Sequence, residues 1–281
     1  MSDFVTRFAP SPTGLLHLGH AASAFAVWDR AAAAGGRLLL RIEDIDQTRC
    51  RPQFEMAILN DLRWLGLDWP EPVRRQSDHF PEYEAVITGL HRRGLAYRCF
   101  RTRREVAAEA DRAPHGTEPV FRGDALSEDE EAARLSAGHA HAWRLSVAAA
   151  REALGKRADT LAYVETSGGQ ARTVSVDIGM ISDVVIGRKD SAASYHLAAC
   201  HDDALQGVTH VIRGEDLASS TPVHVLLQAL MDWPQPVYHH HRLLLDTDGK
   251  RFAKRNKSVT LEQMRESGVT PDEIRRMTAA P

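Results

Sequence analysis

Alternating apolar and polar positions at the start of the chain predict a strand, a helix and a second strand. Residues 4–8 (FVTRF) are typical of a short strand, and residues 17–34 have the spacing of a helix that ends at Gly35 and Gly36. Residues 37–46 (RLLLRIEDID) then predict a second strand. Such a unit builds a parallel sheet, whose ligands bind beyond the carboxyl ends of the strands. The loop APSPTG between the first strand and the helix is therefore a candidate nucleotide site.

The rest of the chain predicts an α/β fold with one interruption. Residues 99–165 are charged and alanine-rich and indicate an inserted subdomain. Before the insertion, residues 53–95 predict helices with turns, and after it residues 173–188 predict a return to the sheet. Next come a predicted helix at 195–207, a strand at 209–217, a helix at 220–233 and two short helices near the end. We therefore expect a catalytic domain made of 1–98 and 166–233, the insertion 99–165, and a C-terminal region 234–281.

Composition and charge narrow the class of protein. The chain has 281 residues, of which 43% are hydrophobic and 26% charged, as expected for one or two globular domains. A net charge of −3 means that any contact with nucleic acid depends on local basic patches. The 3 widely spaced cysteines fit a reducing compartment. Because no apolar signal core or run of ~20 apolar residues is present, we expect a cytoplasmic protein without a membrane partner.

The first loop carries the strongest candidate chemistry. His17 and His20 lie three residues apart at the start of the predicted helix, so their imidazoles share one face. Helix amino termini favour phosphate, and imidazoles can donate hydrogen bonds to oxygens that gain charge. Gly19 would let a flat base approach the backbone. The alternative is a proline-rich turn with two surface histidines.

Charged residues at two predicted strand ends form a second candidate. Glu43 and Asp44 are expected to point to opposite sides of the sheet, and one of these acids could bind an ammonium group. Arg213 ends another strand and suits bidentate binding of a carboxylate. The alternative for Arg213 is a structural ion pair with Glu215 or Asp216.

These segments together resemble the catalytic domain of class I glutamyl-tRNA synthetases. RFAPSPTGLLHLGH, RIEDID, YHLAACHDDALQGVTHVIRGEDL and DGKRFAKR occur in the family's order, with HLGH standing for its HIGH signature and the basic loop for its KMSKS signature. Only 23 residues follow Ser258, too few for an anticodon-binding domain. The chain is therefore most similar to the short paralogues, the glutamyl-Q tRNA(Asp) synthetases, and the resemblance implies a Rossmann-type parallel sheet with an inserted subdomain.

The resemblance also implies an activity and its residues. The family activates L-glutamate with ATP and Mg²⁺ to glutamyl adenylate, and the paralogues transfer glutamate to the queuosine base of tRNA(Asp). The implied glutamate-binding residues are Arg7, Ser11, Glu43, Tyr195 and Arg213, and the implied ATP-binding residues are His17, Gly19, His20 and Lys254, of which His17, His20 and Lys254 would be catalytic. The residues do not indicate which arginine binds the side-chain carboxylate.

Two other functions are compatible with the same resemblance. A truncated or split glutamyl-tRNA synthetase would charge tRNA(Glu) and require a partner chain for anticodon binding. A catalytically idle RNA-binding or regulatory paralogue would need neither the intact HLGH motif nor the carboxylate-binding residues.

The insertion departs from the paralogue family. Members often bind zinc there through CxC followed by YxxxC, but this chain has Cys99 with Arg101, Phe121 and Ala125 at the other three positions. Zinc sites normally need about four ligands, so we expect no zinc, and His115, His139 and His141 have no metal-binding spacing. Apolar packing would then have to replace the metal.

The basic loop GKRFAKRNKS can be aligned with the KMSKS signature in two registers. Aligning the preceding Asp-Gly turn makes Lys254 the second lysine and places Phe252 at the apolar position. The other register uses Lys257 and would place the charge of Arg255 at that position. We therefore expect Lys254 to be the reactive lysine.

This register is testable by two substitutions. Lys254→Ala should slow glutamate-dependent pyrophosphate exchange by ~100-fold, because a cation that stabilises the departing phosphates is lost. Lys257→Ala should have a much smaller effect. A larger loss at Lys257 would show that the register is wrong.

Overall fold

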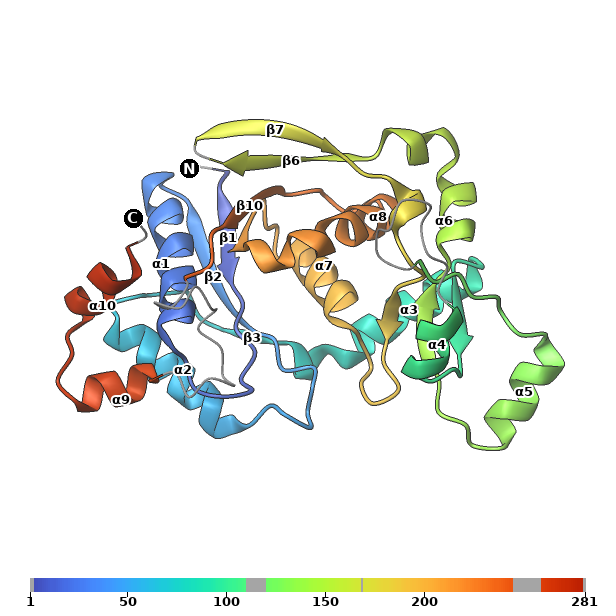
Figure 1. Ribbon diagram of the computed structural model, residues 1–281, viewed down its shortest axis with the longest axis horizontal. Helices are drawn as coiled ribbons and strands as arrows, with labels where there is room; N and C mark the ends of the chain where they lie inside the picture. The colour runs from blue at the N-terminus through green and yellow to red at the C-terminus, as the bar shows by residue number, and fades with distance from the viewer. Residues whose placement is uncertain (1–2, 110–119, 168, 245–258, 280–281) are drawn as a thin grey trace.

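Two sheets made mostly of parallel strands lie side by side and form the centre of the molecule. The structure is a computed structural model that describes residues 3–109, 120–167, 169–244 and 259–279 (Figure 1). The first sheet has the order β1 (Val5–Phe8), β2 (Arg37–Ile42), β3 (Arg74–Arg75), and the second has the order β7 (Gln170–Ser175), β6 (Ala162–Ser167), β10 (Val237–His241), β9 (His210–Gly214). All neighbouring strands are parallel except β6 and β7.

Thr209 joins the two sheets. Its backbone N–H donates to the carbonyl oxygen of Val5 at 2.9 Å, and its hydroxyl accepts from the N–H of Val5 at 2.9 Å. The start of β9 is thereby fixed beside the start of β1. The carboxyl ends of β1, β2 and β9 consequently meet at the same edge, where α/β sheets bind ligands.

The helices connect and cover these strands. They are α1 (Leu18–Ala33), α2 (Pro52–Trp64), α3 (Phe80–Arg92), α4 (Arg103–Glu109), α5 (Glu128–Ser136), α6 (Val147–Leu154), α7 (Tyr195–Leu205), α8 (Thr221–Met231), α9 (Leu261–Glu266) and α10 (Pro271–Thr278), with 3₁₀ turns at Gln76–His79, Gly155–Thr160, Ile178–Met180 and Glu215–Ser220. In Figure 1, α9 and α10 lie beside α1 and α2 at one end of the molecule, and α4, α5 and α6 lie at the other end. No helix in these described ranges is both long enough and apolar enough to cross a membrane.

Helix α1 shows how the local sequence places the first loop. Its buried face consists mostly of small residues, among them Ala21 and Ala24, so the helix packs closely on β1 and β2. The chain then reverses at Gly36, where an added Cβ would lie 2.5 Å from the carbonyl oxygen of Phe4. This close approach requires glycine, and it starts β2 directly beside β1.

Two apolar clusters stabilise the arrangement. One lies around α1, β2 and α2 and includes Leu261 and Ile274 from the last two helices. The other lies among α3, α6, α7, α8 and β10. Arg275 of α10 also pairs with Asp29 of α1 at 2.9 Å. The C-terminal helices therefore pack on the same layer that carries the first loop.

The α/β fold and its parallel sheet are confirmed, with two local differences. The second strand ends at Ile42 and not at residue 46, and the structure adds the two-residue strand β3 beside it. Only part of residues 173–188 returns to the parallel sheet, since β8 (Val185–Gly187) pairs with β5 (Ala142–Leu145) elsewhere. The proposed division into catalytic domain, insertion 99–165 and C-terminal region stays a prediction.

A separate antiparallel sheet combines one strand from within the predicted insertion with one strand that precedes it and one that follows it. It has the order β4 (Ala96–Cys99), β5, β8. Asp183, with 1% of its surface exposed, lies beside it and accepts hydrogen bonds from the hydroxyl of Tyr97 and the N–H groups of Gly123 and Val147, each at 2.9 Å. These three donors come from a strand, a loop and a helix start. A single buried carboxylate therefore links three segments of the region.

Two of the four positions that correspond to the family's zinc ligands are buried. Cys99 and Phe121 are each 3% exposed, and the guanidinium of Arg144 lies 4.7 Å above the Phe121 ring. Among the residues that the structure describes, no group of three or more His, Cys, Asp or Glu side chains could hold a metal ion. Apolar burial and the Asp183 hydrogen bonds stabilise this region of the structure.

Asp183→Ala should destabilise the protein by about 3–5 kcal/mol, because three donors lose a buried acceptor. Thermal and urea unfolding would measure the loss. Asp159→Ala is the control, since Asp159 forms an exposed ion pair with Arg151 and should change stability little. Equal losses for the two variants would contradict the role of Asp183.

Candidate functional site

A cavity of about 370 Å³ lies at the carboxyl ends of β1 and β9 and next to the start of α1. Its volume suits a small ligand with a few oriented polar groups. Every predicted site residue that the structure describes lines it: Arg7, Ser11, His17, Gly19, His20, Glu43, Tyr195 and Arg213. The structure thus brings together residues that are up to 206 positions apart, and Lys254 lies outside the described residues.

His17 and His20 cap the start of α1 reciprocally. The Nδ1 of His17 accepts from the N–H of Gly19 at 3.2 Å, and the Nδ1 of His20 accepts from the N–H of His17 at 3.1 Å. A neutral imidazole with an accepting Nδ1 carries its proton on Nε2. The ring centroids lie 3.8 Å apart. Both rings therefore have an Nε2–H donor, as binding of phosphate oxygens at this helix start requires.

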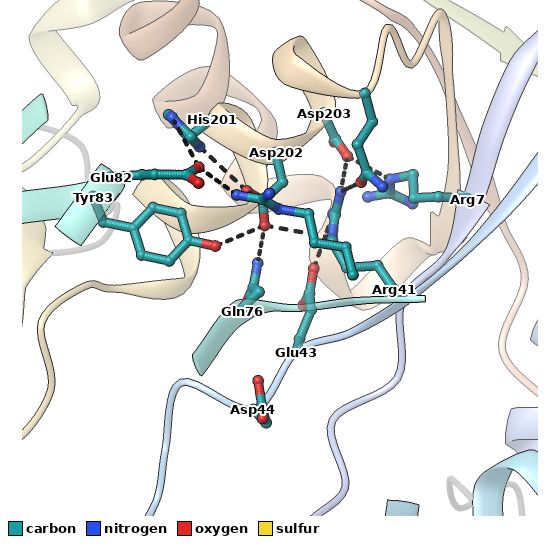
Figure 2. A network of polar contacts seen from close by, with 12 residues as sticks. Arg7, Arg41, Glu43, Asp44, Gln76, Glu82, Tyr83, His201, Asp202 and Asp203 are labelled. Carbon is teal, nitrogen blue, oxygen red and sulfur yellow. Dashed lines mark hydrogen bonds and ion pairs between the residues drawn. The ribbon is translucent and has the colours of Figure 1, made fainter. Parts of the chain in front are cut away.

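Glu43 lies just beyond β2 and points toward the arginines (Figure 2). One of its oxygens accepts from Arg41 at 3.0 Å, and only 8% of the residue is exposed. Burial raises the pKa of Glu43, and the charges of Arg41 and Arg7 offset only part of that effect. A ligand ammonium group at this carboxylate would stabilise its charged form.

Asp44 lies apart from this cluster, and no dashed line joins it to the other residues in Figure 2. It accepts from the N–H and hydroxyl of Ser77 at 2.8 and 2.6 Å. Both residues follow the end of the strand, so the expectation that they point to opposite sides of the sheet does not apply, but they do contact different partners. Of these two acids, Glu43 is the one that lines the cavity.

Arg7 extends from β1 and is held by an acid of α7. Its Nε donates to Asp203 at 2.9 Å, and the same carboxylate oxygen accepts from Arg41 at 2.8 Å. Burial alone would raise the pKa of Asp203, but Arg7 and Arg41 lower it below its ordinary value. The carboxylate is consequently charged, and it orients Arg7 at the wall of the cavity.

Arg213 is buried among neutral groups. Its guanidinium donates to the hydroxyls of Tyr195 at 3.3 Å and Thr221 at 2.7 Å, and to ring nitrogens of His224 and His240 at 3.3 Å. Within the described ranges, no carboxylate forms an ion pair with Arg213, so the suggested pairs with Glu215 or Asp216 are not formed there. A buried cation with only neutral neighbours favours an anionic ligand.

Tyr195 begins α7, and the cap of that helix fixes its position. The Ser194 hydroxyl accepts from the N–H of Leu197, which places Tyr195 at the first helical residue facing the cavity. Burial raises the pKa of Tyr195, so its phenol stays protonated and can donate to a carboxylate.

Sequence reasoning did not assign roles to Arg41, Asp203, His224 and His240. The available signals were a charged residue inside an otherwise apolar strand, RLLLRI, and two acids within the apolar helical stretch YHLAACHDDAL. Charges at such positions indicate buried pairs. The two histidines had no such signal, because a histidine among apolar residues has no distinctive spacing.

The described residues on either side of the basic loop lie next to the cavity. Leu243 and Leu244 line it before the loop. After the loop, Thr260 forms a bridge with His17, and the N–H of Leu261 donates to the carbonyl oxygen of Leu16 at 2.9 Å. The described residues that flank 245–258, the segment that contains Lys254 and Lys257, thus lie at the walls of this site.

Comparison with protein families gives a match over nearly the whole chain. Residues 3–279 match the family described as tRNA synthetases class I (E and Q), catalytic domain. This range includes every residue named above at the cavity.

Two relatives and one solved structure illustrate the similarity. The chain is 45% identical to a glutamyl-Q tRNA(Asp) synthetase of Rhodobacter capsulatus over 97% of this chain and 99% of the relative. It is 42% identical to one of Nocardia farcinica, over 95% and 81% respectively. A crystal structure of a glutamate tRNA ligase from Elizabethkingia meningosepticum, in complex with its amino acid, superimposes with a TM-score of 0.77 at 27% identity. That match covers 99% of this chain and 60% of the ligase.

Proposed function

Since the chain belongs to the family of class I tRNA synthetases (E and Q), we propose that it activates L-glutamate with ATP and transfers the glutamyl group to the queuosine base of tRNA(Asp). One observation carries the proposal. A single cavity combines the carboxylate of Glu43, the paired imidazoles of His17 and His20, and the guanidinium of Arg213, whose hydrogen-bond partners are neutral. The guanidinium and the carboxylate match the charged groups of a dicarboxylic amino acid, and the two imidazoles match a phosphate chain.

Glutamate is bound through its three charged groups. Glu43 binds the α-ammonium group, helped by Ser11, and Arg7 and Arg213 each bind one carboxylate. Tyr195 donates a further hydrogen bond from the hydroxyl that touches Arg213. Neutral glutamine would leave one buried guanidinium without a counter-charge, so the cavity selects against it.

ATP lies over Gly19, with its phosphates against His17 and His20. The Nε2–H groups of both rings and the start of α1 contact phosphate oxygens as their charge increases. Mg²⁺ neutralises the phosphates when bound with ATP, which supplies oxygen ligands for it. Lys254 acts from the basic loop that joins Leu244 to Thr260.

The reaction needs no protein nucleophile. The glutamate α-carboxylate attacks the α-phosphorus, the bond to the bridging oxygen breaks, and pyrophosphate leaves together with its charge. A queuosine hydroxyl then attacks the carbonyl carbon of glutamyl adenylate, loses its proton and displaces AMP. Positioning and charge stabilisation lower both barriers.

A second cavity, of about 850 Å³, suits the accepting nucleotide. Tyr195 lines both cavities, so the second one adjoins the place where the adenylate forms. Arg103, Arg144 and Arg188 line it together with serine hydroxyls and apolar side chains. Arginine suits phosphate, and apolar surfaces and hydroxyls suit a base and its sugar. We place the queuosine nucleotide in this cavity.

Pyrophosphate exchange and charging assays test the proposed function. The protein should exchange pyrophosphate with ATP in the presence of glutamate and without RNA, and it should glutamylate queuosine-containing tRNA(Asp). Queuosine-free tRNA(Asp) is the control and should not be charged. Charging of tRNA(Glu) alone would contradict the proposal and favour a glutamyl-tRNA synthetase, whereas no exchange with an intact site would favour an idle paralogue.

Arg103→Ala tests the nucleotide cavity separately. The loss of one exposed phosphate contact should lower kcat/KM for transfer to tRNA by roughly tenfold and reduce its salt dependence, while RNA-independent exchange stays unchanged. Arg37→Ala is the control, because Arg37 is an exposed arginine at the first residue of β2, the end of the strand opposite the site. Equal effects of both substitutions on transfer would exclude a specific role for Arg103.

A further inference from the structure

Arg213 is joined to a chain of two buried histidines. Its Nη1 lies 3.3 Å from the Nδ1 of His224, and the Nε2 of His224 lies 3.2 Å from the Nδ1 of His196. His224 is 3% exposed and comes from α8, whereas His196 comes from α7 and lines the second cavity. Three different elements therefore contribute to one line of hydrogen bonds that begins at a guanidinium of the first cavity.

The direction of these hydrogen bonds is fixed by chemistry. A guanidinium only donates, so the Nδ1 of His224 must accept. The proton of a neutral His224 is then on Nε2, from which it donates to the Nδ1 of His196. His224 can fill this position only as a neutral ring, since protonation would place a second N–H against Arg213.

The surroundings of His224 keep it neutral. Burial lowers its pKa well below the ordinary value, and the cationic neighbour Arg213 lowers it further. His196 and Tyr195 from α7 also face its ring. His240 from β10 lies on the other side of Arg213, and burial lowers its pKa too, although Glu165 opposes the shift. The groups that α7, α8 and β10 place next to the Arg213 guanidinium are thus uncharged.

The other buried arginines near the site differ in this respect. Arg41 pairs with Glu43 at 3.0 Å and with Asp203 at 2.8 Å, and Arg7 pairs with Asp203 at 2.9 Å. Their charges are compensated within the protein. In the described part of the chain, four of the five N–H groups of Arg213 have oriented acceptors and none of these acceptors is a carboxylate, so its orientation and its charge are controlled separately.

We propose that His224 is a positioning and specificity-determining residue, which orients Arg213 as a neutral acceptor and leaves the charge of Arg213 for a ligand carboxylate. The inference rests on the proposed function, because it assigns how that site selects an anionic amino acid. An acidic residue at position 224 would orient Arg213 equally well and would cancel its charge. Two properties of His224 are therefore required, namely a hydrogen-bond acceptor and the absence of charge.

Three substitutions separate these two properties. His224→Gln retains a neutral acceptor for Arg213 and a donor for His196, and it should leave the KM for glutamate within about threefold of the unsubstituted protein. His224→Leu removes the acceptor and should raise this KM by roughly tenfold. His224→Glu keeps the acceptor but adds a negative charge, and should raise the KM by ~100-fold. The KM for ATP should change less than about threefold in all three variants.

The measurement is pyrophosphate exchange at varied glutamate and ATP, with circular dichroism to verify folding. His210→Leu is the matched control, because His210 is a partly buried histidine of β9, the strand that carries Arg213, and its ring stacks on Phe4 at 4.1 Å. It should leave both KM values unchanged. Since glutamine and glutamate side chains are similar in size, comparison of His224→Gln with His224→Glu remains decisive even if His224→Leu does not fold.

The outcomes distinguish a failure of the proposed function from a failure of the role assigned to His224. An unsubstituted protein without glutamate-dependent exchange would overturn the proposed function itself. Normal exchange combined with an unchanged glutamate KM in His224→Leu, or with equal KM values in His224→Gln and His224→Glu, would overturn only the role of His224. A proportional rise in the KM for ATP would also overturn it, because a general disturbance of the site would then explain the loss.

Discussion

The ion network around Arg41 is the interaction on which the site depends. Arg41 is fully buried in β2 and pairs with Glu43 and with Asp203 of α7, while Arg7 of β1 shares Asp203 (Figure 2). Burial alone would lower the pKa of Arg41, but these acids raise it above its ordinary value. Loss of one partner would leave a buried charge uncompensated, at a cost of about 3–5 kcal/mol. The network therefore fixes two strands and a helix relative to one another.

The distribution of acids in this network explains the properties of the cavity. Asp203 compensates Arg7 and Arg41, and Asp202 accepts from Arg74 and Gln76, so the carboxylates of α7 are occupied on the side of the first sheet. On the side of the second sheet, neutral groups orient Arg213. The cavity between them consequently has a negative group for an ammonium ion and an excess positive charge for an anion. This asymmetry matches the two ends of an acidic amino acid.

A second buried acid with several donors lies beside the small antiparallel sheet of β4, β5 and β8. Asp183 receives three hydrogen bonds from segments that the sequence separates widely, and Cys99 and Phe121, which lie close in sequence to two of its donors, are buried. The N–H of Ser194, the residue before α7, donates to the carbonyl oxygen of Ile186 in β8 at 2.9 Å, so this small sheet also helps to position Tyr195. The wall shared by the two cavities thus depends on both parts of the molecule.

The sequence by itself determined the elements and most of the site. Apolar periodicity located β1, α1, α7, β9 and α8, and the HLGH and VIRGED motifs identified residues that the structure does place around one cavity, because local motifs keep their geometry at strand ends and helix starts. The sequence could not determine which strand pairs with β8, or whether Arg213 forms an ion pair with a carboxylate of the protein. Those depend on which distant side chains come within hydrogen-bond distance, such as His224, and only tertiary packing decides that. For the same reason, the tertiary structure alone shows that the acid nearest Arg7 is Asp203, which lies 196 residues away.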